Sequence, residues 1–372
     1  MGDLRKCGGG IGMKLGSAVA AMLLLGAEAM GEEWLKWEPL PPIPDEVGLA
    51  GPFTGVHEDT LIVAGGANFA PPVWESDKVW HNKIYALSLA EENLSWRVAG
   101  ELERPLGYGT TASLPEGVLC IGGNDASAVF SEVFLLSRNG SEVAREDLPS
   151  LPRPLVYASA ALLGNHVYVA GGQTGNGLET ATSTFLKLDW SKREEDSFGW
   201  EELESWPGPP RAFASLVAQS NGRNETLYLA GGRHLAANGE VTFLNDLYEF
   251  DPLSSTAPWT RKADLPAPLA AGTVAALGQS HLVVLGGADG TLFARSDELR
   301  DEHPGFPRQS FAYHTITNTW VEAGTLPNNQ VTTEAVTHGE EIFLLSGEVR
   351  PRVRTPESWR VTLQSRDVPF AA

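Results

Sequence analysis

The chain has 372 residues, a length that alone would allow two domains, and its formal net charge at pH 7 is −20. So much negative charge argues against nucleic acid as a partner, because binding a phosphate backbone needs a basic surface. The two cysteines, Cys7 and Cys120, are too few for a disulfide framework or a cysteine-based metal site.

Residues 1–31 have the features of a secretion signal. Basic residues precede an apolar stretch at 15–26, which is too short to span a bilayer. The sequence Ala-Glu-Ala at 27–29 fits a small-x-small cleavage site and predicts a mature chain from near Met30, although translation could also start at Met13. We therefore expect a periplasmic or secreted protein with no stable membrane insertion after cleavage. The alternative is an uncleaved membrane anchor.

Six hydrophobic runs, each ending in a glycine pair or in Ser-Gly, follow the predicted signal. They are 61–66 (LIVAGG), 118–123 (VLCIGG), 167–172 (VYVAGG), 227–232 (LYLAGG), 282–287 (LVVLGG) and 342–347 (IFLLSG). The final glycines stand at 66, 123, 172, 232, 287 and 347, so the successive steps are 57, 49, 60, 55 and 60 residues. A period of about 50 residues is typical of kelch repeats. The pattern predicts an all-β fold, with residues 32–372 forming one six-bladed kelch-type β-propeller.

The repeats also predict how the ring closes. Each run has an apolar strand before it and two strand-like segments after it, so one repeat gives a four-stranded blade. The last repeat has its third strand at 359–363 but no fourth, whereas a surplus strand-like segment lies at 34–38. We expect these two segments to pair, because closure removes open sheet edges and holds down both ends of the chain.

A functional site should lie where loops from all the blades meet. The loops that follow the glycine pairs and those that lead into the first strands emerge at the same end of each blade. The first set carries Asn68, Asn124, Gln173, Arg233, Asp289 and Glu348, and the second carries Arg104, Arg153, Arg211 and Gln330. Several arginines in an acidic protein predict a site for a small anion. The alternative for Arg153 and Arg211 is a structural role, in which they bridge neighbouring blades.

The sixth repeat departs from the others. Its run ends in Ser346-Gly347, and Glu348 follows, with arginines at 350, 352 and 354. Alternate residues of an extended chain share a face, so the carboxylate and the arginines can act together, or they can form a local cluster of ion pairs. The eight histidines are dispersed without metal-ligand spacing, and no G-x-S-x-G motif is present, so the sequence predicts no metal site and no such nucleophile.

Three stretches resemble the kelch-type N-acetylneuraminate epimerases, also called sialic acid mutarotases, and in particular their cyclically permuted relatives. The first is GLAGPFTGV at 48–56 with AGGANF at 64–69, the second is GEL at 100–102 with RPLGYG at 104–109, and the third is Gly-Glu at 347–348 with Arg-Thr at 354–355. In that family the equivalent segments at 48–123 come late in the chain, whereas in this chain they come first.

The resemblance implies an isomerase that interconverts the α and β anomers of sialic acid without a cofactor. It implies that Glu348 is the general base and that Arg354 binds the substrate carboxylate. Further candidates for contacts with a small acidic sugar are Asn68, Arg104, Tyr108, Arg153 and Arg211. Two rival functions are a non-catalytic propeller that binds glycans or proteins, and a copper oxidase like the galactose oxidases. The second needs a reactive cysteine, and Cys120 lies inside a predicted strand.

Overall fold

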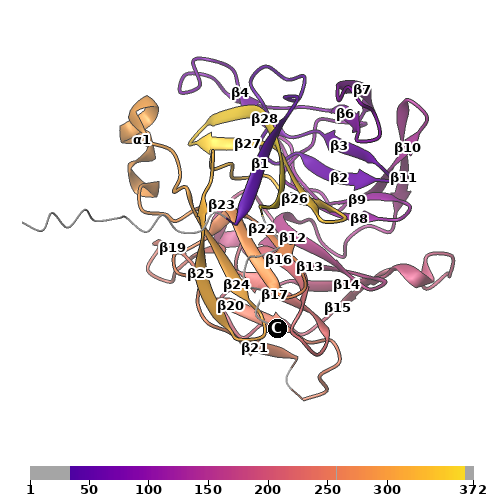
Figure 1. Cartoon of the computed structure of the whole chain (residues 1–372), viewed down its shortest axis with the longest axis vertical. Helices are drawn as coiled ribbons and strands as arrows, with labels where there is room; N and C mark the ends of the chain where they lie inside the picture. The colour runs from indigo at the N-terminus through magenta and orange to yellow at the C-terminus, as the bar shows by residue number, and fades with distance from the viewer. Residues whose placement is uncertain (1–33, 257, 365–372) are drawn as a thin grey trace, which may run out of the picture. The chain divides into compact units, whose positions relative to one another are not determined.

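The structure is a computed structural model that describes residues 34–256 and 258–364. Six four-stranded antiparallel sheets follow one another along the chain, as Figure 1 shows. The predicted six-bladed propeller is confirmed, and its blades are numbered 1 to 6 in chain order. The predicted signal at 1–31 lies outside the described residues.

The first three blades use consecutive chain segments, and within each blade the strands run in order from the innermost to the outermost. Blade 1 contains β2 (Phe53–His57), β3 (Thr60–Ala64), β6 (Lys83–Ser88) and β7 (Trp96–Glu101). Blade 2 contains β8 (Thr110–Leu114), β9 (Gly117–Ile121), β10 (Val133–Asn139) and β11 (Glu142–Leu148). Blade 3 contains β12 (Val156–Leu163), β13 (His166–Gln173), β14 (Phe185–Asp189) and β15 (Trp200–Glu202).

The last three blades complete the ring. Blade 4 contains β16 (Ser215–Ser220), β17 (Glu225–Ala230), β20 (Leu247–Phe250) and β21 (Trp259–Arg261). Blade 5 contains β22 (Ala270–Leu277), β23 (His281–Ala288), β24 (Gln309–His314) and β25 (Thr319–Thr325). Blade 6 contains β26 (Ala335–His338), β27 (Glu341–Arg350), β28 (Val353–Leu363) and β1 (Leu35–Leu40). Each innermost strand contacts that of the next blade, and β26 contacts β2.

Short elements occupy the connections between strands. Two hairpins follow glycine pairs and stand outside the blades: β4 (Ala67–Phe69) with β5 (Lys78–Trp80), and β18 (Arg233–Leu235) with β19 (Val241–Phe243). The helical turns are η1 (Leu178–Thr180), η2 (Trp190–Lys192), η3 (Phe293–Arg295), α1 (Ser296–Leu299) and η4 (Arg300–Glu302). No helix among the described residues is long and apolar enough to cross a membrane.

The N-terminal strand closes blade 6 as predicted. Strand β1 pairs with the outer edge of β28, with Trp37 opposite Val361, and in Figure 1 the indigo β1 lies beside the yellow β28. The apolar side chains Trp34, Leu35 and Leu40 are buried by this pairing, with 8%, 4% and 8% of their surface exposed. The sheet edge of the last blade is therefore covered by the start of the propeller.

The hydrophobic core lies between the blades. Each pair of neighbouring blades shares one apolar cluster; for example, Ile62 and Ala86 of blade 1 pack with Val118 and Cys120 of blade 2. Second strands such as β3 and β9 are buried along their whole length, which explains their continuous aliphatic sequences. A single blade cannot bury both of its faces, so stability depends on stacking around the ring.

The repeated glycine pairs link each blade to the next. The Gly66 amide donates a hydrogen bond to the Leu106 carbonyl, which leads into blade 2, at 2.8 Å. The backbone of Gly65 has a φ of +65°, and a Cβ there would lie 2.1 Å from that same carbonyl oxygen. Blade 6 makes the equivalent link through the Gly347 amide, which donates to the Leu49 carbonyl at 2.9 Å, and the Ser346 hydroxyl also accepts a hydrogen bond from the Leu49 amide at 2.8 Å.

A closed circle of six backbone hydrogen bonds surrounds the propeller axis just before the innermost strands. Its members are Gly51, Tyr108, Tyr157, Phe213, Ala271 and Thr332, and each amide donates to the carbonyl of the member in the preceding blade at 2.7–3.0 Å. All six have a positive φ between 50° and 62°. We call this circle the axial ring; it surrounds the point where the loops of all six blades converge.

Candidate functional site

A cavity of about 620 Å³ opens at the end of the propeller that carries the glycine-pair loops. Its base is formed by members of the axial ring, namely Tyr108, Tyr157, Phe213, Ala271 and Thr332. The charged lining consists of four cations and two carboxylates: Lys78, Arg233, Arg352, Arg354, Asp289 and Glu348. The cavity is thus rich in positive charge although the chain is strongly acidic. Of the arginines that the sequence assigned to the two sets of converging loops, only Arg233 lines it.

Glu348 and Arg354 lie opposite each other on the hairpin formed by β27 and β28. Nη1 of Arg354 is 2.9 Å from Oε2 of Glu348, and the Arg352 amide donates to Oε1 of Glu348 at 2.9 Å. The backbone of Glu348 exchanges two hydrogen bonds with Val331, the residue before Thr332 of the axial ring. The carboxylate is therefore fixed in direction at the edge of the cavity.

Arg354 is held deep in the wall of the cavity, with 2% of its side chain exposed compared with 15% for Glu348. Its Nη2 donates to the Tyr108 hydroxyl at 3.3 Å, and its guanidinium lies 5.0 Å from the centre of the Phe69 ring. Burial acts to lower the pKa of Arg354, but Glu348 and Tyr108 outweigh it and raise the pKa. Arg354 thus carries a permanent charge that is directed at Glu348.

Aromatic side chains form the base of the cavity. The rings of Tyr157 and Phe213 are stacked 4.2 Å apart, and Tyr108 meets Tyr157 edge-on at 5.2 Å. Burial raises the pKa values of Tyr108 and Tyr157, so both hydroxyls stay protonated at neutral pH and can donate hydrogen bonds. Aromatic faces with a few polar groups between them are typical of small-molecule sites.

One wall of the cavity comes from the segment between β23 and β24, which contains η3, α1 and η4. Phe293, Ser296 and His303 of this segment line the cavity. The segment is attached to the β27–β28 hairpin, because Nη1 of Arg350 donates to the Asp301 carbonyl at 2.6 Å. The wall and the Glu348 hairpin are thus joined on one side of the opening.

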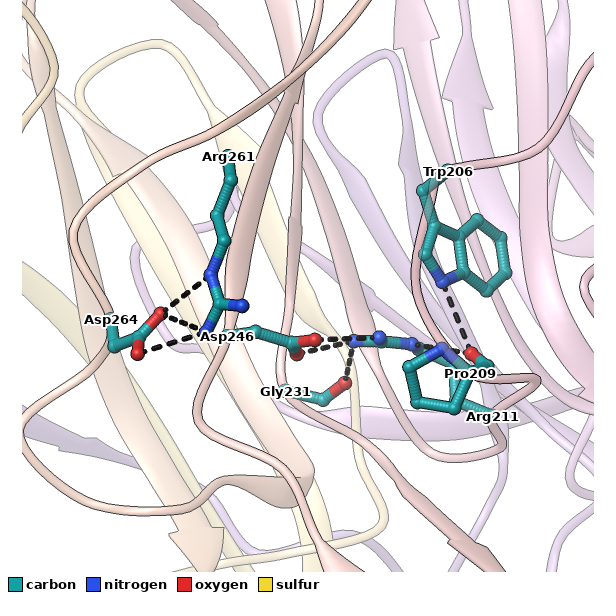
Figure 2. A network of polar contacts seen from close by, with 7 residues as sticks. All are labelled: Trp206, Pro209, Arg211, Gly231, Asp246, Arg261 and Asp264. Atoms are coloured by element: carbon teal, nitrogen blue, oxygen red, sulfur yellow. Dashed lines mark hydrogen bonds and ion pairs between the residues drawn. The ribbon is translucent and has the colours of Figure 1, made fainter.

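Among the sequence-based candidates, the cavity brings together Glu348, Arg354 and Tyr108, but Arg211 lies elsewhere. Figure 2 shows its fully buried guanidinium between Pro209, Gly231 and Asp246. It donates to both carboxylate oxygens of Asp246, at 2.6 and 2.8 Å, and to the Gly231 carbonyl at 2.7 Å. These contacts join the segment before blade 4 to blade 4 itself. Arg211 therefore has a structural role, as the alternative proposed, but it acts within one blade and does not bridge two blades.

Arg104 and Arg153 repeat the Arg211 arrangement nearer the surface. Arg104 lies 3.7 Å from Glu132 and packs over Phe130, and Arg153 lies 2.7 Å from Glu202. Neither side chain lines the cavity, which corrects the expectation that both would contact a small acidic sugar there. The physical reason is that the carboxylates of their own blades already hold these guanidinium groups.

Asn68 is also outside the cavity lining. Its side-chain amide donates to the Gly48 carbonyl at 3.0 Å, and its oxygen is 2.9 Å from Nε2 of His81. Asn68 is 6% exposed. It therefore fastens the segment before blade 1 to the β4–β5 hairpin, and its hydrogen bonds leave it no free group for a ligand.

Arg233, at the start of β18, was expected in the converging loops but was not singled out as a ligand contact. Lys78 of the β4–β5 hairpin, and Tyr157 and Phe213 of the axial ring, were not anticipated from the sequence. The repeat itself could have indicated the last two, because they stand at the same point of their blades as Tyr108. Lys78 had no such signal, since its hairpin is an insertion in blade 1.

A separate small pocket is lined by the axial ring and Glu334, and a larger one by the innermost strands of the central channel. The carboxyl of Glu334 lines this channel and accepts hydrogen bonds from the Thr110 hydroxyl at 2.6 Å and from the Thr111 hydroxyl at 2.7 Å. Burial raises the pKa of Glu334 to about 7, although these hydrogen bonds act in the opposite direction. Sequence reasoning did not single out this residue.

Within the part of the chain that the structure describes, no group of three or more histidine, cysteine or acidic side chains could hold a metal ion. Cys120 is completely buried in β9, and burial raises the pKa of its thiol well above the usual value. Cys120 is therefore a small apolar core residue.

Comparison with known proteins points to one family. A family model described as N-acetylneuraminate epimerase matches residues 12–144. The N-acetylneuraminate epimerase of Yersinia enterocolitica serotype O:8 / biotype 1B is 27% identical over 248 residues, which cover 60% of this chain and 59% of that protein. The resemblance to the N-acetylneuraminate epimerase family is confirmed.

Other N-acetylneuraminate epimerases match in the same way. The protein of Haemophilus influenzae (strain PittEE) is 28% identical over 235 residues, covering 56% of this chain and 58% of that protein. The protein of Yersinia pestis (strain Pestoides F) is 36% identical over 128 residues, covering 29% and 31%. The chain thus spans 59%, 58% and 31% of the length of these three curated relatives.

The fold extends the likeness over more of the chain. The solved structure described as "Structure of YjhT" superposes with a TM-score of 0.66 at 15% sequence identity, covering 88% of this chain and 98% of that one. At this level of identity the match supports the propeller fold alone.

Proposed function

We propose that this protein interconverts the α and β anomers of N-acetylneuraminate in the cavity that contains Glu348. The observation that carries the proposal is a fixed carboxylate at the edge of a cationic, aromatic-lined cavity, in a chain similar to N-acetylneuraminate epimerases. Cationic side chains suit an acidic sugar, and aromatic rings suit the apolar face of a pyranose.

The reaction needs proton transfer at two oxygen atoms. Glu348 takes the proton of the C2 hydroxyl, the bond between C2 and the ring oxygen breaks, and the ring oxygen receives a proton. Rotation about the bond between C2 and C3 then presents the other face of the carbonyl, and the reverse steps close the ring. The open cavity lets water supply and remove the second proton, so the overall reaction consumes no proton and needs no cofactor.

The surroundings of Glu348 suit this role. Two contacts fix its carboxylate: an ion pair with Arg354 at one oxygen and a hydrogen bond from the Arg352 amide at the other. A base that is held in place before the ligand binds loses little entropy on reaching the transition state. Positioned proton transfer of this kind contributes about 10²–10⁴-fold to a rate.

The test is the rate of anomer exchange, followed by proton NMR after α-N-acetylneuraminate is released from a glycoside. We expect the wild-type protein to accelerate the conversion and Glu348→Gln to reduce kcat by about 10²–10⁴-fold. The matched control is Glu46→Gln, a change of the same kind away from the cavity lining. Equal rates for the wild type and Glu348→Gln would refute the role of Glu348.

The same experiment separates catalysis from simple binding. A propeller that only binds glycans would bind N-acetylneuraminate in a calorimetric titration but leave the rate of anomer exchange at its uncatalysed value. That outcome would refute the proposed reaction.

A further inference from the structure

The four cations of the cavity differ in the groups that each one contacts. Arg354 pairs with Glu348 at 2.9 Å, and only 2% of its side chain is exposed. A ligand carboxylate at Arg354 would compete with Glu348, the proposed base, for the guanidinium. The resemblance to the epimerases implies that Arg354 holds the carboxylate, but its surroundings assign it to orienting Glu348.

Arg352 is also occupied. Its Nη2 donates to the Ser76 carbonyl at 2.6 Å, and its guanidinium packs over Phe69 and Trp74 at 4.1 and 5.4 Å from the ring centres. These contacts fix Arg352 as part of the wall.

Arg233 and Lys78 are different, because within the described part of the chain neither forms an ion pair or a side-chain hydrogen bond. The Arg233 guanidinium lies between Phe213 and Phe293, at 4.4 and 5.4 Å from the ring centres. Its buried Nε has no hydrogen-bond partner, which is also true of Nε in Arg352 and Arg354. Burial lowers the pKa of Arg233, while Tyr157 and Glu348 act in the opposite direction. The group is still charged at neutral pH, because arginine does not deprotonate in proteins.

Lys78 is held in the same way by aromatic rings. Its ammonium is 4.9 Å from the centre of Tyr108, 5.3 Å from Trp80 and 5.8 Å from Phe69. Burial lowers its pKa, Tyr157 and Glu348 raise it, and the two neighbouring arginines lower it further. A desolvated cation without a carboxylate partner is costly unless a ligand supplies one.

Tyr157 lies between the two cations in a row of rings at the base of the cavity. Lys78 lies over Tyr108, which meets Tyr157 edge-on, and Tyr157 stacks on Phe213, over which Arg233 lies. Glu348 is at the edge of the same cavity, so a ligand bound beside these cations shares the enclosure with the proposed base.

We infer that Arg233 and Lys78, on either side of the Tyr157 ring, form the site for the carboxylate of the acidic sugar, and that Arg354 is a positioning residue for Glu348. The inference rests on the proposed function for the identity of the ligand. Arg233 supplies a fork of donors for a carboxylate, and Lys78 adds a single charge.

The test compares N-acetylneuraminate with its C1 methyl ester, which has the same ring but no negative charge. The measured quantity is the ratio of kcat/KM for the acid to that for the ester. Removing a charged hydrogen-bond partner should lower this ratio about 10–100-fold in Arg233→Gln and in Lys78→Met, mainly through KM for the acid. Arg233→Lys should recover part of the loss.

Two comparison variants complete the design. Arg354→Gln should lower kcat for the acid and the ester alike, leaving their ratio within about twofold of the wild type, as expected of a residue that acts through Glu348. Arg104→Gln makes the same change at an arginine outside the cavity and should alter neither value. Thermal unfolding of each variant checks that it is folded.

The inference is overturned if Arg354→Gln alone lowers the acid-to-ester ratio, if Arg233→Gln reduces both substrates equally, or if the wild type does not distinguish acid from ester. Calorimetric titration with the two sugars shows whether the anion site fails or the proposed reaction fails, because it measures binding without turnover. Preferential binding of the acid without turnover, lost in Arg233→Gln, supports the anion site and refutes the reaction. Turnover of both sugars with equal kcat/KM refutes the anion site and supports the reaction.

Discussion

At the scale of single residues, the arginines differ in whether a carboxylate lies beside the guanidinium and in which one it is. Arg211 meets Asp246 inside blade 4, Arg354 meets Glu348 at the cavity, and Arg233 meets aromatic rings alone. The sequence carries no sign of this division, because all three arginines lie in similar loops near the same end of the propeller. Burial and the nearest acid decide which arginine is structural.

Arg211 should therefore matter for stability rather than for ligand binding. Arg211→Met leaves Asp246 as an uncompensated buried charge, which should lower the free energy of unfolding by about 3–5 kcal/mol. The double variant Arg211→Met with Asp246→Leu should recover much of this loss. Urea unfolding measures both. An unchanged stability combined with a raised KM would instead identify Arg211 as a ligand-binding residue.

Glu334 predicts a dependence of stability on pH. Its pKa is about 7 in the folded protein and near the ordinary value of 4.5 after unfolding, so the folded state binds more protons between these values. The free energy of unfolding should fall as the pH rises from about 4.5 to about 7, by up to about 3 kcal/mol for this residue. Glu334→Gln should lack this contribution.

The measurement is the difference in unfolding free energy between wild type and Glu334→Gln at several pH values, since the other carboxylates cancel in the difference. A difference that stays constant from about pH 4.5 to about pH 8 would contradict the raised pKa.

The candidate site was predictable in part. The Gly347-Glu348 sequence and the arginine at 354 indicated the hairpin that we propose to be catalytic, because they stand close together in the chain and on one face of it. Lys78 belongs to a hairpin inserted in blade 1, and only the folded chain brings it near Arg233. Contacts of that kind depend on the ring as a whole and cannot be deduced from local spacing.

At the scale of structural elements, the axial ring is the feature least visible in the sequence. Five of its six members are not glycine, yet all adopt a left-handed backbone that L-residues rarely use. Each amide is tied to the carbonyl of the preceding blade, and this circle of hydrogen bonds imposes the conformation. This left-handed conformation cannot be predicted from the residue types at these positions, which are tyrosine, phenylalanine, alanine and threonine.

Strand β1 makes the clearest prediction at this scale. Deleting residues 32–40 removes Trp34, Leu35 and Leu40 from the core, each worth about 1.5–3 kcal/mol, and exposes the edge of β28. The melting temperature should fall by about 10 °C or more.

Adding a peptide with the sequence of residues 34–40 should raise the melting temperature of the shortened protein, whereas a peptide of the same composition in scrambled order should not. An unchanged melting temperature after the deletion would contradict the role of β1 in closing the ring.

At the scale of the whole molecule, the cavity is displaced toward one side of the ring because the axial ring is asymmetric. Blades 2, 3 and 4 contribute Tyr108, Tyr157 and Phe213, whereas blades 5, 6 and 1 contribute Ala271, Thr332 and Gly51. The small side chains leave space beside Glu348 that the large ones fill on the other side. The sequence predicted the number of blades, the closing strand and the end of the propeller that carries the cavity, but not which side of the axial ring the cavity favours.

This asymmetry can be reversed at one position. Ala271→Phe puts the side chain of Phe213 onto an equivalent backbone, since the φ values are 50° and 59°. The variant should fold normally, but its ring should occupy the cavity and reduce anomerase activity by about 10-fold or more. Ala271→Ser, which adds little volume, should stay active. Full activity in Ala271→Phe with an unchanged melting temperature would show that the ligand binds elsewhere.

A crystal structure of the protein soaked with N-acetylneuraminate tests most directly whether Glu348 acts on C2 of the sugar. We predict that the sugar lies in the cavity above the axial ring, with its C2 hydroxyl oxygen about 2.6–3.2 Å from a carboxylate oxygen of Glu348. A sugar bound away from this cavity, or bound in it with C2 turned away from Glu348, would contradict this role of Glu348.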